Sequence, residues 1–218
     1  FASVAGTTRN NLARINSDAT LDTTFDPNIN NEVDAVALQP DGSILVGGLF
    51  TGLRPYGVIM IGGAFSHVSG SVVTNLALLN EDGNANGGFR PNPNGVVNAL
   101  LVQVDGKVVV GGAFTTMAGT TRNRLARFNA DGTLDGSFNP DASDQVYALA
   151  LQADGRILVG GAFTSIGGAA RSRVARLNAD GSVDGTFNPG ANDSVYVLVV
   201  QPDGSVVAGG AFTSLGGA

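Results

Sequence analysis

The chain has 218 residues, enough for a sizeable core in one or two domains. Its 12 Lys+Arg against 18 Asp+Glu give a formal net charge of −6, and the basic residues stand singly, which argues against nucleic-acid and anionic-membrane partners. The absence of cysteine excludes disulfides and thiolate chemistry, and no apolar run is long enough to span a membrane.

A repeat of 49 residues runs along the chain. The tetrapeptide Gly-Gly-Ala-Phe returns at this spacing, and three further markers keep the same register. Because four markers agree, chance is excluded and the chain is predicted to be a repeat protein. The markers are Gly-Gly-Ala-Phe at 62–65, 111–114, 160–163 and 209–212, Phe at 89, 138 and 187, Asp-Gly at 105–106, 154–155 and 203–204, and Asn-x-Asp-Gly at 80–83, 129–132 and 178–181.

The first half of a repeat is predicted to be a buried hairpin, illustrated by the copy that begins at Val146. Residues 146–151 carry aliphatic or aromatic side chains on both faces, which is typical of a strand buried on two sides. Residues 153–155, Ala-Asp-Gly, form a tight turn. Residues 157–159 form a second buried strand, which ends in the Gly-Gly-Ala-Phe of 160–163.

The second half of the repeat is more polar. Residues 164–172 are Gly-rich and are expected to form a longer loop, and 174–177 alternates in polarity like a half-exposed strand. Residues 178–181 turn the chain again. Residues 183–187 are predicted to be the last strand, which Pro189 ends because proline cannot donate to a strand ladder.

Each unit therefore holds four short strands, joined mostly by hairpins. A sheet this apolar would expose its faces to water unless successive sheets stack face to face. We predict an all-β fold, a β-propeller of four-stranded antiparallel blades with four to five blades, alone or within a longer array; other β-repeat arrays are the alternative. The expected domain is 1–218, with units at 1–29 (partial), 30–92 (irregular), 93–141, 142–190 and 191–218 (partial).

The repeat resembles a known family. The run NPDASDQVYALALQADGRILVGGAFTSIGGAARSRVARLNADGSVDGTFNPG, residues 139–190, is similar to the bacterial delta-60 repeat, and the resemblance covers nearly the whole chain. The resemblance implies a propeller-forming fold and a place in large, often exported, bacterial proteins. It carries no catalytic motif.

One unit departs from the pattern. Gly47-Gly48-Leu49-Phe50 precedes the Gly-Gly-Ala-Phe of 62–65 by 15 residues, so the second-strand motif occurs twice in close succession. Three explanations remain open: a blade that has lost its outer strands, an inserted hairpin, or residues missing from the chain.

The two ends of the chain hold complementary parts of a unit. Residues 8–25 supply the last two strands and 195–212 supply the first two, so together they could complete a blade. Residues 1–7 and 212–218 occupy the same repeat positions, which favours a longer array instead.

An arginine and an aspartate recur at fixed repeat positions and disappear together. The copy around Phe65 has Leu78 and Asn86 at these positions. Paired loss is expected of an ion pair between the last two strands, because a lone partner would be left unpaired. A separation well beyond about 4 Å would refute the pairing. The expected pairs are Arg14–Asp22, Arg127–Asp135 and Arg176–Asp184.

The Asn-x-Asp-Gly-x-x-Asp pattern has two interpretations. It places oxygen side chains at positions one and three, as calcium loops do, but no bidentate Glu follows. A turn in which Asn and Asp bond the backbone is the alternative, and the replacement of Gly by Ala19 favours it. No other cofactor or metal is expected. The calcium candidates are Asn129, Asp131, Asp135, Asn178, Asp180 and Asp184.

His67, the single histidine, stands where other units have Ser or Thr and is expected in a surface loop. The recurrent phenylalanines are expected to pack in the core between blades rather than to serve with the tyrosines as sugar-stacking platforms, and Tyr147 and Tyr196, which stand in first strands, are also expected in the core. The phenylalanines that end the second strand are Phe65, Phe114, Phe163 and Phe212, and the tyrosines are Tyr56, Tyr147 and Tyr196.

The near-identical units, the low charge and the lack of a catalytic cluster favour a non-enzymatic structural or adhesive module of a large extracellular or cell-surface bacterial protein. A carbohydrate-binding propeller with one shallow site per blade is the second hypothesis. An enzyme that uses the propeller channel is the third. The expected partners are a protein or a surface glycan, or another copy bound through the repeat edges.

Overall fold

We describe the fold from a computed structural model of the chain. It describes residues 3–4, 6–8, 13, 15–16, 18, 20–22, 33–38, 44–48, 59–80 and 84–216, with the backbone alone for 33–38, 44–48 and 59. Within these residues all regular structure is β-strand, and no helix is long and apolar enough to cross a membrane. The contacts divide the chain into Phe1–Arg90 and Pro91–Ala218, which we describe separately.

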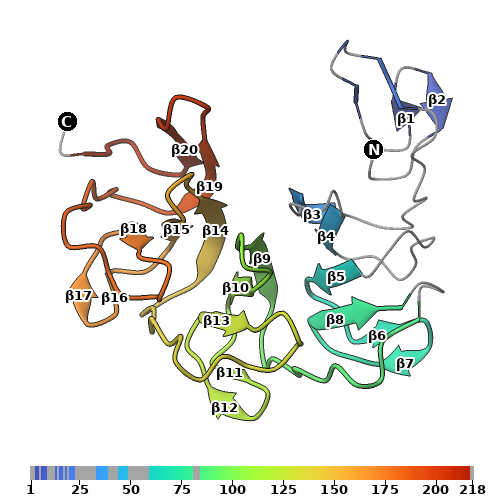
Figure 1. Ribbon diagram of the computed structural model, residues 1–218. Helices are drawn as coiled ribbons and strands as arrows, with labels where there is room; N and C mark the ends of the chain where they lie inside the picture. Colours follow the sequence, from blue (N-terminus) through green and yellow to red (C-terminus); the bar gives the residue numbers. More distant parts are fainter. Residues whose placement is uncertain are drawn as a thin grey trace. The chain divides into compact units, whose positions relative to one another are not determined.

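The second unit contains three successive antiparallel sheets, which confirms the all-β prediction (Figure 1). In the two complete sheets the second strand is central, flanked by the first and third strands. The first sheet is β9 (Val97–Val102), β10 (Val108–Gly112) and β13 (Leu125–Phe128), the next is β14 (Val146–Leu151), β15 (Ile157–Gly161) and β18 (Val174–Leu177), and the last is β19 (Val195–Val200) and β20 (Val206–Gly210). Two-residue hairpins, β11 (Thr116–Met117) with β12 (Thr120–Thr121) and β16 (Ser165–Ile166) with β17 (Ala169–Ala170), precede the third strands.

The first unit contains shorter sheets, all of two strands among the described residues. They are β1 (Ser3–Val4) with β2 (Thr7–Thr8), β3 (Val33–Leu38) with β4 (Ile44–Gly48), β5 (Ile59–Gly62) with β8 (Leu76–Leu79), and β6 (His67–Val68) with β7 (Ser71–Val72). The irregular segment thus forms two incomplete sheets. The first, β3–β4, consists of a first and a second strand, and the second, β5–β8, consists of a second and a third strand. Residues 49–58 between them lie outside the described residues.

Three details of the predicted repeat are wrong. The segment 164–172 contains the β16–β17 hairpin, and β18 is largely buried rather than half exposed. The predicted last strand at 183–187 is reduced to the single bridge Leu177↔Val183. Its continuation is a turn, because Asp184 accepts a hydrogen bond from the Thr186 amide and so removes that amide from any ladder.

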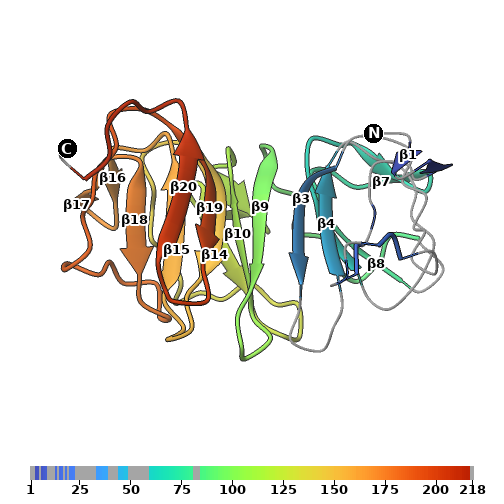
Figure 2. The ribbon, with the colours of Figure 1, turned by 90° about the horizontal axis from the view of Figure 1, so that it is seen from above.

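The stacked sheets of the second unit bury opposite faces of the same strand. β14 lies against β9 on one side and β19 on the other (Figure 2). Along β15, Ile157 and Val159 pack into one cluster while Leu158 between them packs into the other, as the two-residue period of a strand requires. All three side chains are fully buried, and burial of each stabilises the fold by about 1.5–3 kcal/mol.

The first glycine of two Gly-Gly-Ala-Phe motifs, Gly111 and Gly160, lets the next sheet approach. A Cβ at Gly111 would lie 2.6 Å from Cγ1 of Val146, and one at Gly160 would lie 2.9 Å from Cγ1 of Val195. At Gly209 the nearest atom to such a Cβ is 3.8 Å away. Glycine is therefore required sterically at the first two positions and is not required at the third.

Candidate functional site

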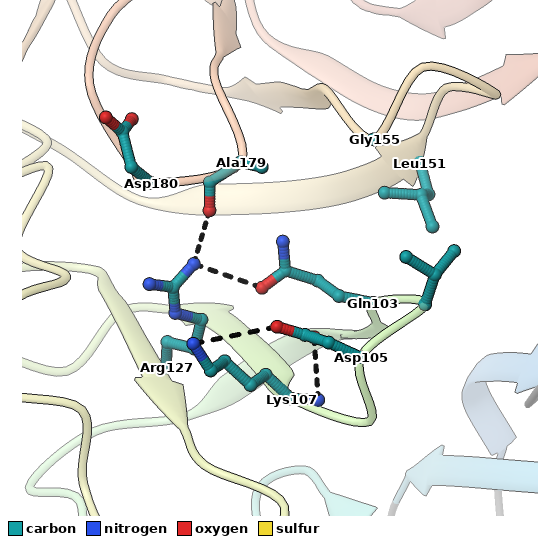
Figure 3. A pocket seen from close by; sticks show the side chains of 9 residues that line it. Gln103, Asp105, Lys107, Arg127, Leu151, Gly155, Ala179 and Asp180 are labelled. Carbon is teal, nitrogen blue, oxygen red and sulfur yellow. Dashed lines mark hydrogen bonds and ion pairs between the residues drawn. The ribbon is translucent and has the colours of Figure 1, made fainter.

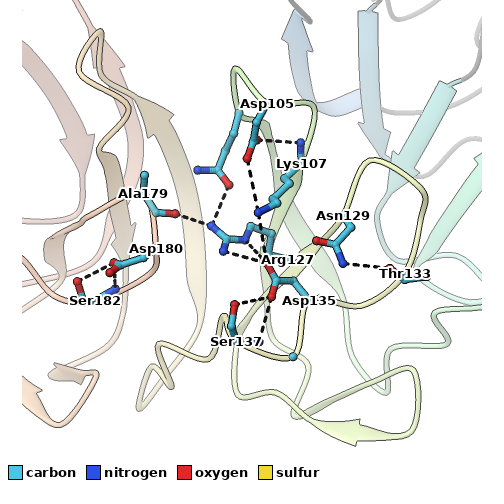
Figure 4. Close-up of polar contacts among 12 residues, drawn as sticks. Asp105, Lys107, Arg127, Asn129, Thr133, Asp135, Ser137, Ala179, Asp180 and Ser182 are labelled. Carbon is cyan, nitrogen blue, oxygen red and sulfur yellow. Dashed lines mark hydrogen bonds and ion pairs between the residues drawn. The ribbon is translucent and has the colours of Figure 1, made fainter.

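An arginine and an aspartate form a buried ion pair in the second unit (Figure 4). Arg127 lies on β13, and its Nε and Nη2 are each 2.9 Å from Oδ2 of Asp135. The other carboxylate oxygen, Oδ1, accepts hydrogen bonds from the Ser137 amide at 3.0 Å and the Ser137 hydroxyl at 2.6 Å. The arginine side chain is 5% exposed and the aspartate side chain 10%. The expected pairing is therefore present, with both partners shielded from water.

Arg127 also joins its own repeat to the next one. Its Nη1 donates to Oε1 of Gln103 at 3.1 Å and to the backbone carbonyl of Ala179, which lies in the Asn-x-Asp-Gly turn of the following repeat. Its guanidinium carbon lies 4.4 Å from the centroid of the Phe138 ring, a cation–π contact. A planar group with five donors can make all these contacts at once, which a lysine could not.

The next repeat contains the same pair. Arg176 Nε donates to Oδ2 of Asp184 at 2.8 Å, and Oδ1 of Asp184 accepts from the amide and the hydroxyl of Thr186 at 2.8 and 2.7 Å. The guanidinium carbon is 4.6 Å from the Phe187 ring centroid. A second basic group, Arg156, places its Nε 3.6 Å from Oδ2 of Asp184.

These hydrogen bonds and charges favour the ionised carboxylates. The pKa of Asp135 falls from its ordinary 3.8 to about 2, chiefly through the hydrogen bond from the Ser137 hydroxyl, with the hydrogen bond and charge of Arg127 as smaller causes. The pKa of Asp184 falls to about 2 for the same reasons, with Thr186 first and Arg176 after it. Both groups are therefore charged at neutral pH.

The copy without the charges keeps the backbone geometry. The amide of Asn86 donates to the carbonyl of Leu78 at 2.7 Å, as Asp135 does to Arg127 at 2.8 Å. Oδ1 of Asn86 accepts from the amide of Gly88 at 2.8 Å, so an uncharged side chain is sufficient for the turn. The carboxylate is needed only where the arginine is present.

The N-terminal copy of the pair is only partly described. Arg14 lies outside the described residues. Asp22 is half-buried and follows the bridge Ile15↔Leu21, as Asp135 follows the bridge Phe128↔Leu134.

A pocket of about 340 Å³ lies beside the Arg127 pair, between two successive repeats of the second unit (Figure 3). Its ionic groups largely neutralise one another: Nζ of Lys107 is 3.6 Å from Oδ2 of Asp105 and 3.8 Å from Oδ2 of Asp135. The volume is at the lower end of the range for small-molecule sites. Such a pocket suits water or a small neutral polar ligand. Its lining residues are Gln103, Val104, Asp105, Lys107, Arg127, Leu151, Gly155, Ala179 and Asp180.

The calcium candidates of the Asn-x-Asp-Gly turns are engaged within the turns. Oδ1 of Asp131 accepts from the amide and the hydroxyl of Thr133 at 2.9 and 2.6 Å, and Nδ2 of Asn129 donates to the same hydroxyl at 3.0 Å. Among the described residues no three His, Cys, Asp or Glu side chains gather as a metal site. The geometry favours the turn over a calcium loop. The same bonds recur at Asn178, Asp180 and Ser182 and at Asn16, Asp18 and Thr20.

The recurrent phenylalanines are not all equivalent. Phe114 and Phe163 are fully buried, whereas Phe65 and Phe212 are only half-buried. The last two belong to the two-stranded sheets β5–β8 and β19–β20, which have fewer strands to cover them. Core packing was predicted for all four and is complete only in the three-stranded sheets.

Two of the other sequence candidates, His67 and Tyr196, are exposed, and Tyr147 is half-buried. His67 is exposed on β6, and its Nδ1 is 2.9 Å from the hydroxyl oxygen of Ser66. Tyr147 and Tyr196 meet edge to face with centroids 5.2 Å apart, and Tyr196 is 51% exposed, so the expected core position is wrong for Tyr196. Tyr56 lies outside the described residues.

Two further arginines in each of the two complete repeats of the second unit have structural roles that the motif spacing alone does not reveal. Nη2 of Arg122 donates to the carbonyl of Gly136 at 3.2 Å, and Nη1 of Arg124 donates to the carbonyl of Phe114 at 3.1 Å. Recurrence of arginine at both positions 49 residues later is the signal that points to them. The equivalent residues Arg171 and Arg173 also donate to backbone carbonyls.

The fold and these contacts define an all-β repeat protein whose successive antiparallel sheets are tied together by side chains. The chain belongs to the family described as domain of unknown function (DUF5122) beta-propeller, which matches most of it and confirms the β-propeller family that the repeat resembles. The matched residues are 1–25, 39–54, 57–89, 103–138, 152–187 and 201–218. No curated protein matches the chain.

Proposed function

We propose that this chain is a non-enzymatic structural or adhesive repeat module, of four to five blades, in a large extracellular bacterial protein. The observation that carries the proposal is the use of the recurrent charges. Arg127 and Asp135 are engaged in bonds that hold the repeat together, and Arg176 and Asp184 repeat the pair. The charged side chains that a catalytic site would expose to a substrate are here bonded to each other within the repeat.

The proposal is tested with the purified chain coated on beads. We expect the beads to adhere to cells or to surfaces that carry protein or glycan, and beads with heat-unfolded chain to lose this adhesion. The soluble chain should not turn over small ester, glycoside or phosphate substrates. Turnover above the buffer rate, or equal adhesion by folded and unfolded chain, would refute the proposal. Removal of the protein by protease from intact source cells tests the surface location.

A second candidate function, glycan binding, is favoured by the aromatic pair on β14 and β19. Tyr147 and Tyr196 are in contact, and the second of them is half exposed, so the pair offers an amphipathic surface on which a sugar ring could stack. At the equivalent position one repeat earlier, Asn98 instead donates to the carbonyl of Val146. A glycan array at millimolar concentration should show binding that Tyr196→Ala abolishes and Val72→Ala, at another exposed position, preserves. No binding by the unmodified chain would exclude this function.

A further inference from the structure

The pocket beside the Arg127–Asp135 pair has walls from two successive repeats. One wall is formed by the turn between β9 and β10 and by Arg127 on β13. The facing wall is formed by Leu151 at the end of β14, by Gly155, and by the turn at 179–180. Both repeats lie within Pro91–Ala218 and contain three-stranded sheets, so the pocket follows from the packing of two complete sheets of one unit.

One buried side chain in this pocket has hydrogen-bond donors that the protein does not use. Gln103 is 5% exposed, and its Oε1 accepts from Nη1 of Arg127 at 3.1 Å. Its Nε2 lies on the side of the amide away from Arg127 and donates to no atom of the described residues (Figure 3). Polar groups in side chains this buried usually have a partner, which is the protein, water or a ligand. The amide of Gln103 therefore marks a place where a ligand can bind.

Two more polar side chains line the pocket near this amide (Figure 3). Oδ1 of Asp105 accepts from the backbone amide of Lys107 at 3.2 Å, whereas Oδ2 is 3.6 Å from Nζ of Lys107. The same Nζ is 3.8 Å from Oδ2 of Asp135. Both of these separations exceed the length of a hydrogen bond, so Oδ2 of Asp105 can still accept from a ligand and Nζ can still donate to one. The pocket therefore combines donors with an acceptor.

The charges that line the pocket cancel. Lys107 and Arg127 are cationic, and Asp105 and Asp180 are anionic. The guanidinium of Arg127 is also 2.9 Å from the carboxylate of Asp135. An anion or a cation would lose its hydration on entering the pocket and would gain little from a field that is close to neutral. These charges favour a ligand that is polar and uncharged.

We propose that the pocket binds a small neutral polyol, such as a single sugar ring, through two neighbouring hydroxyl groups. A hydroxyl both accepts and donates, so one can accept from Nε2 of Gln103 while its neighbour donates to the carboxylate of Asp105. Leu151 supplies an apolar wall for the C–H groups of the ring, and a volume of about 340 Å³ holds one ring rather than an oligosaccharide. The site goes beyond the proposed function and does not include Tyr147 or Tyr196.

Nuclear magnetic resonance tests the proposal at the amide itself. The side-chain N–H groups of Gln103 give their own signals, which are identified by their loss in Gln103→Met. We expect glucose, methyl glucoside or inositol to shift these signals saturably, with a Kd of about millimolar for so small a ligand, whereas glycine and inorganic phosphate should not. Methyl glucoside models a sugar at the end of a glycan, so it separates a terminal glycan residue from a free polyol. The melting temperature is a poor readout here, because sugars stabilise proteins generally by exclusion from their surface.

A pair of variants at matched repeat positions completes the test. Lys107→Met should weaken polyol binding about fivefold or more by removing a donor, whereas Arg156→Met, one repeat later and outside the pocket, should not change it. Tyr196→Ala should also leave the titration unchanged, and failure of this test leaves the adhesion assay unaffected, because adhesion does not depend on this pocket. The proposal would be overturned by no saturable shift with any of the three polyols, by tighter binding of glycine or phosphate, or by a Kd that Lys107→Met changes no more than Arg156→Met does.

Discussion

Replacing Arg127 by leucine should destabilise the protein more than replacing Arg127 and Asp135 together. The single substitution leaves a carboxylate that is 10% exposed without the guanidinium that lies 2.9 Å away, and it removes the bonds to Gln103 and Ala179. Removing one partner of a buried ion pair costs about 3–5 kcal/mol, because the remaining charge stays desolvated. We expect a loss in this range from Arg127→Leu.

The double substitution Arg127→Leu with Asp135→Asn reproduces the natural pair Leu78 and Asn86. The asparagine can still accept the hydrogen bond of the turn, as Asn86 does from Gly88, and no unpaired charge remains. The free energy of unfolding of the double variant should therefore be about 1–2 kcal/mol lower than that of the wild type. The two sites should therefore show a coupling energy of at least about 1 kcal/mol, even if Asp135→Asn alone costs nothing.

Urea unfolding followed by circular dichroism measures these free energies, compared at a common slope. Arg156→Leu is the matched control, because its side chain is 43% exposed and a surface ion pair contributes about 0–1 kcal/mol. If the two single losses simply add in the double variant, Arg127 and Asp135 do not stabilise the repeat as a pair, and the explanation of their joint loss is wrong.

Three further predictions concern pH, packing and metal. The pKa of Asp135 is about 2 in the fold and about 3.9 unfolded, so its contribution to stability is complete above about pH 4 and is lost as the pH falls towards 2; Asp135→Asn should flatten this acid limb in urea titrations. Gly160→Ala should cost about 1–3 kcal/mol through the clash with the next sheet, whereas Gly209→Ala should be neutral or stabilising, and equal shifts in melting temperature would contradict this. Millimolar calcium should leave the melting temperature unchanged, because the turn oxygen of Asp131 already accepts two hydrogen bonds; a saturable rise would reveal a site.

The sequence was informative wherever a feature repeats with a fixed spacing. The 49-residue period predicted the buried first and second strands, and the joint loss at Leu78 and Asn86 predicted the ion pair of Arg127 and Asp135. A buried charge without its partner is so unfavourable that loss of the arginine at one position requires loss of the aspartate at the other. The turn interpretation of Asn-x-Asp-Gly had a similar basis, since short polar side chains bond nearby amides.

Contacts between repeats could not be predicted in the same way. Arg127 donates a hydrogen bond to the backbone carbonyl of Ala179. Every residue type has this carbonyl, so the contact does not restrict which amino acid stands at position 179. The expected fourth strand does not form because the Asp184 carboxylate accepts a hydrogen bond from the Thr186 amide, which a strand ladder would also need. Strand propensity does not include this competition. Tyr196 is exposed although Asn98 and Tyr147, at the same repeat position, are half-buried, so the repeat position alone did not predict its exposure.

Residues at equivalent repeat positions have different exposures in this chain. This difference limits which positions could give the protein specificity for a ligand. Val109, Leu158 and Val207 share one repeat position, yet Val207 is 51% exposed while Val109 and Leu158 are fully buried, so the exposure of a residue is not fixed by its repeat position. A ligand site peculiar to this protein must instead use positions whose side chains differ between repeats. The position of Asn98, Tyr147 and Tyr196 is one of these, because it changes from an inter-repeat hydrogen bond to an aromatic contact. Substitution of the half-exposed Tyr196 should change binding more than stability, and substitutions at the Arg–Asp pair should do the reverse.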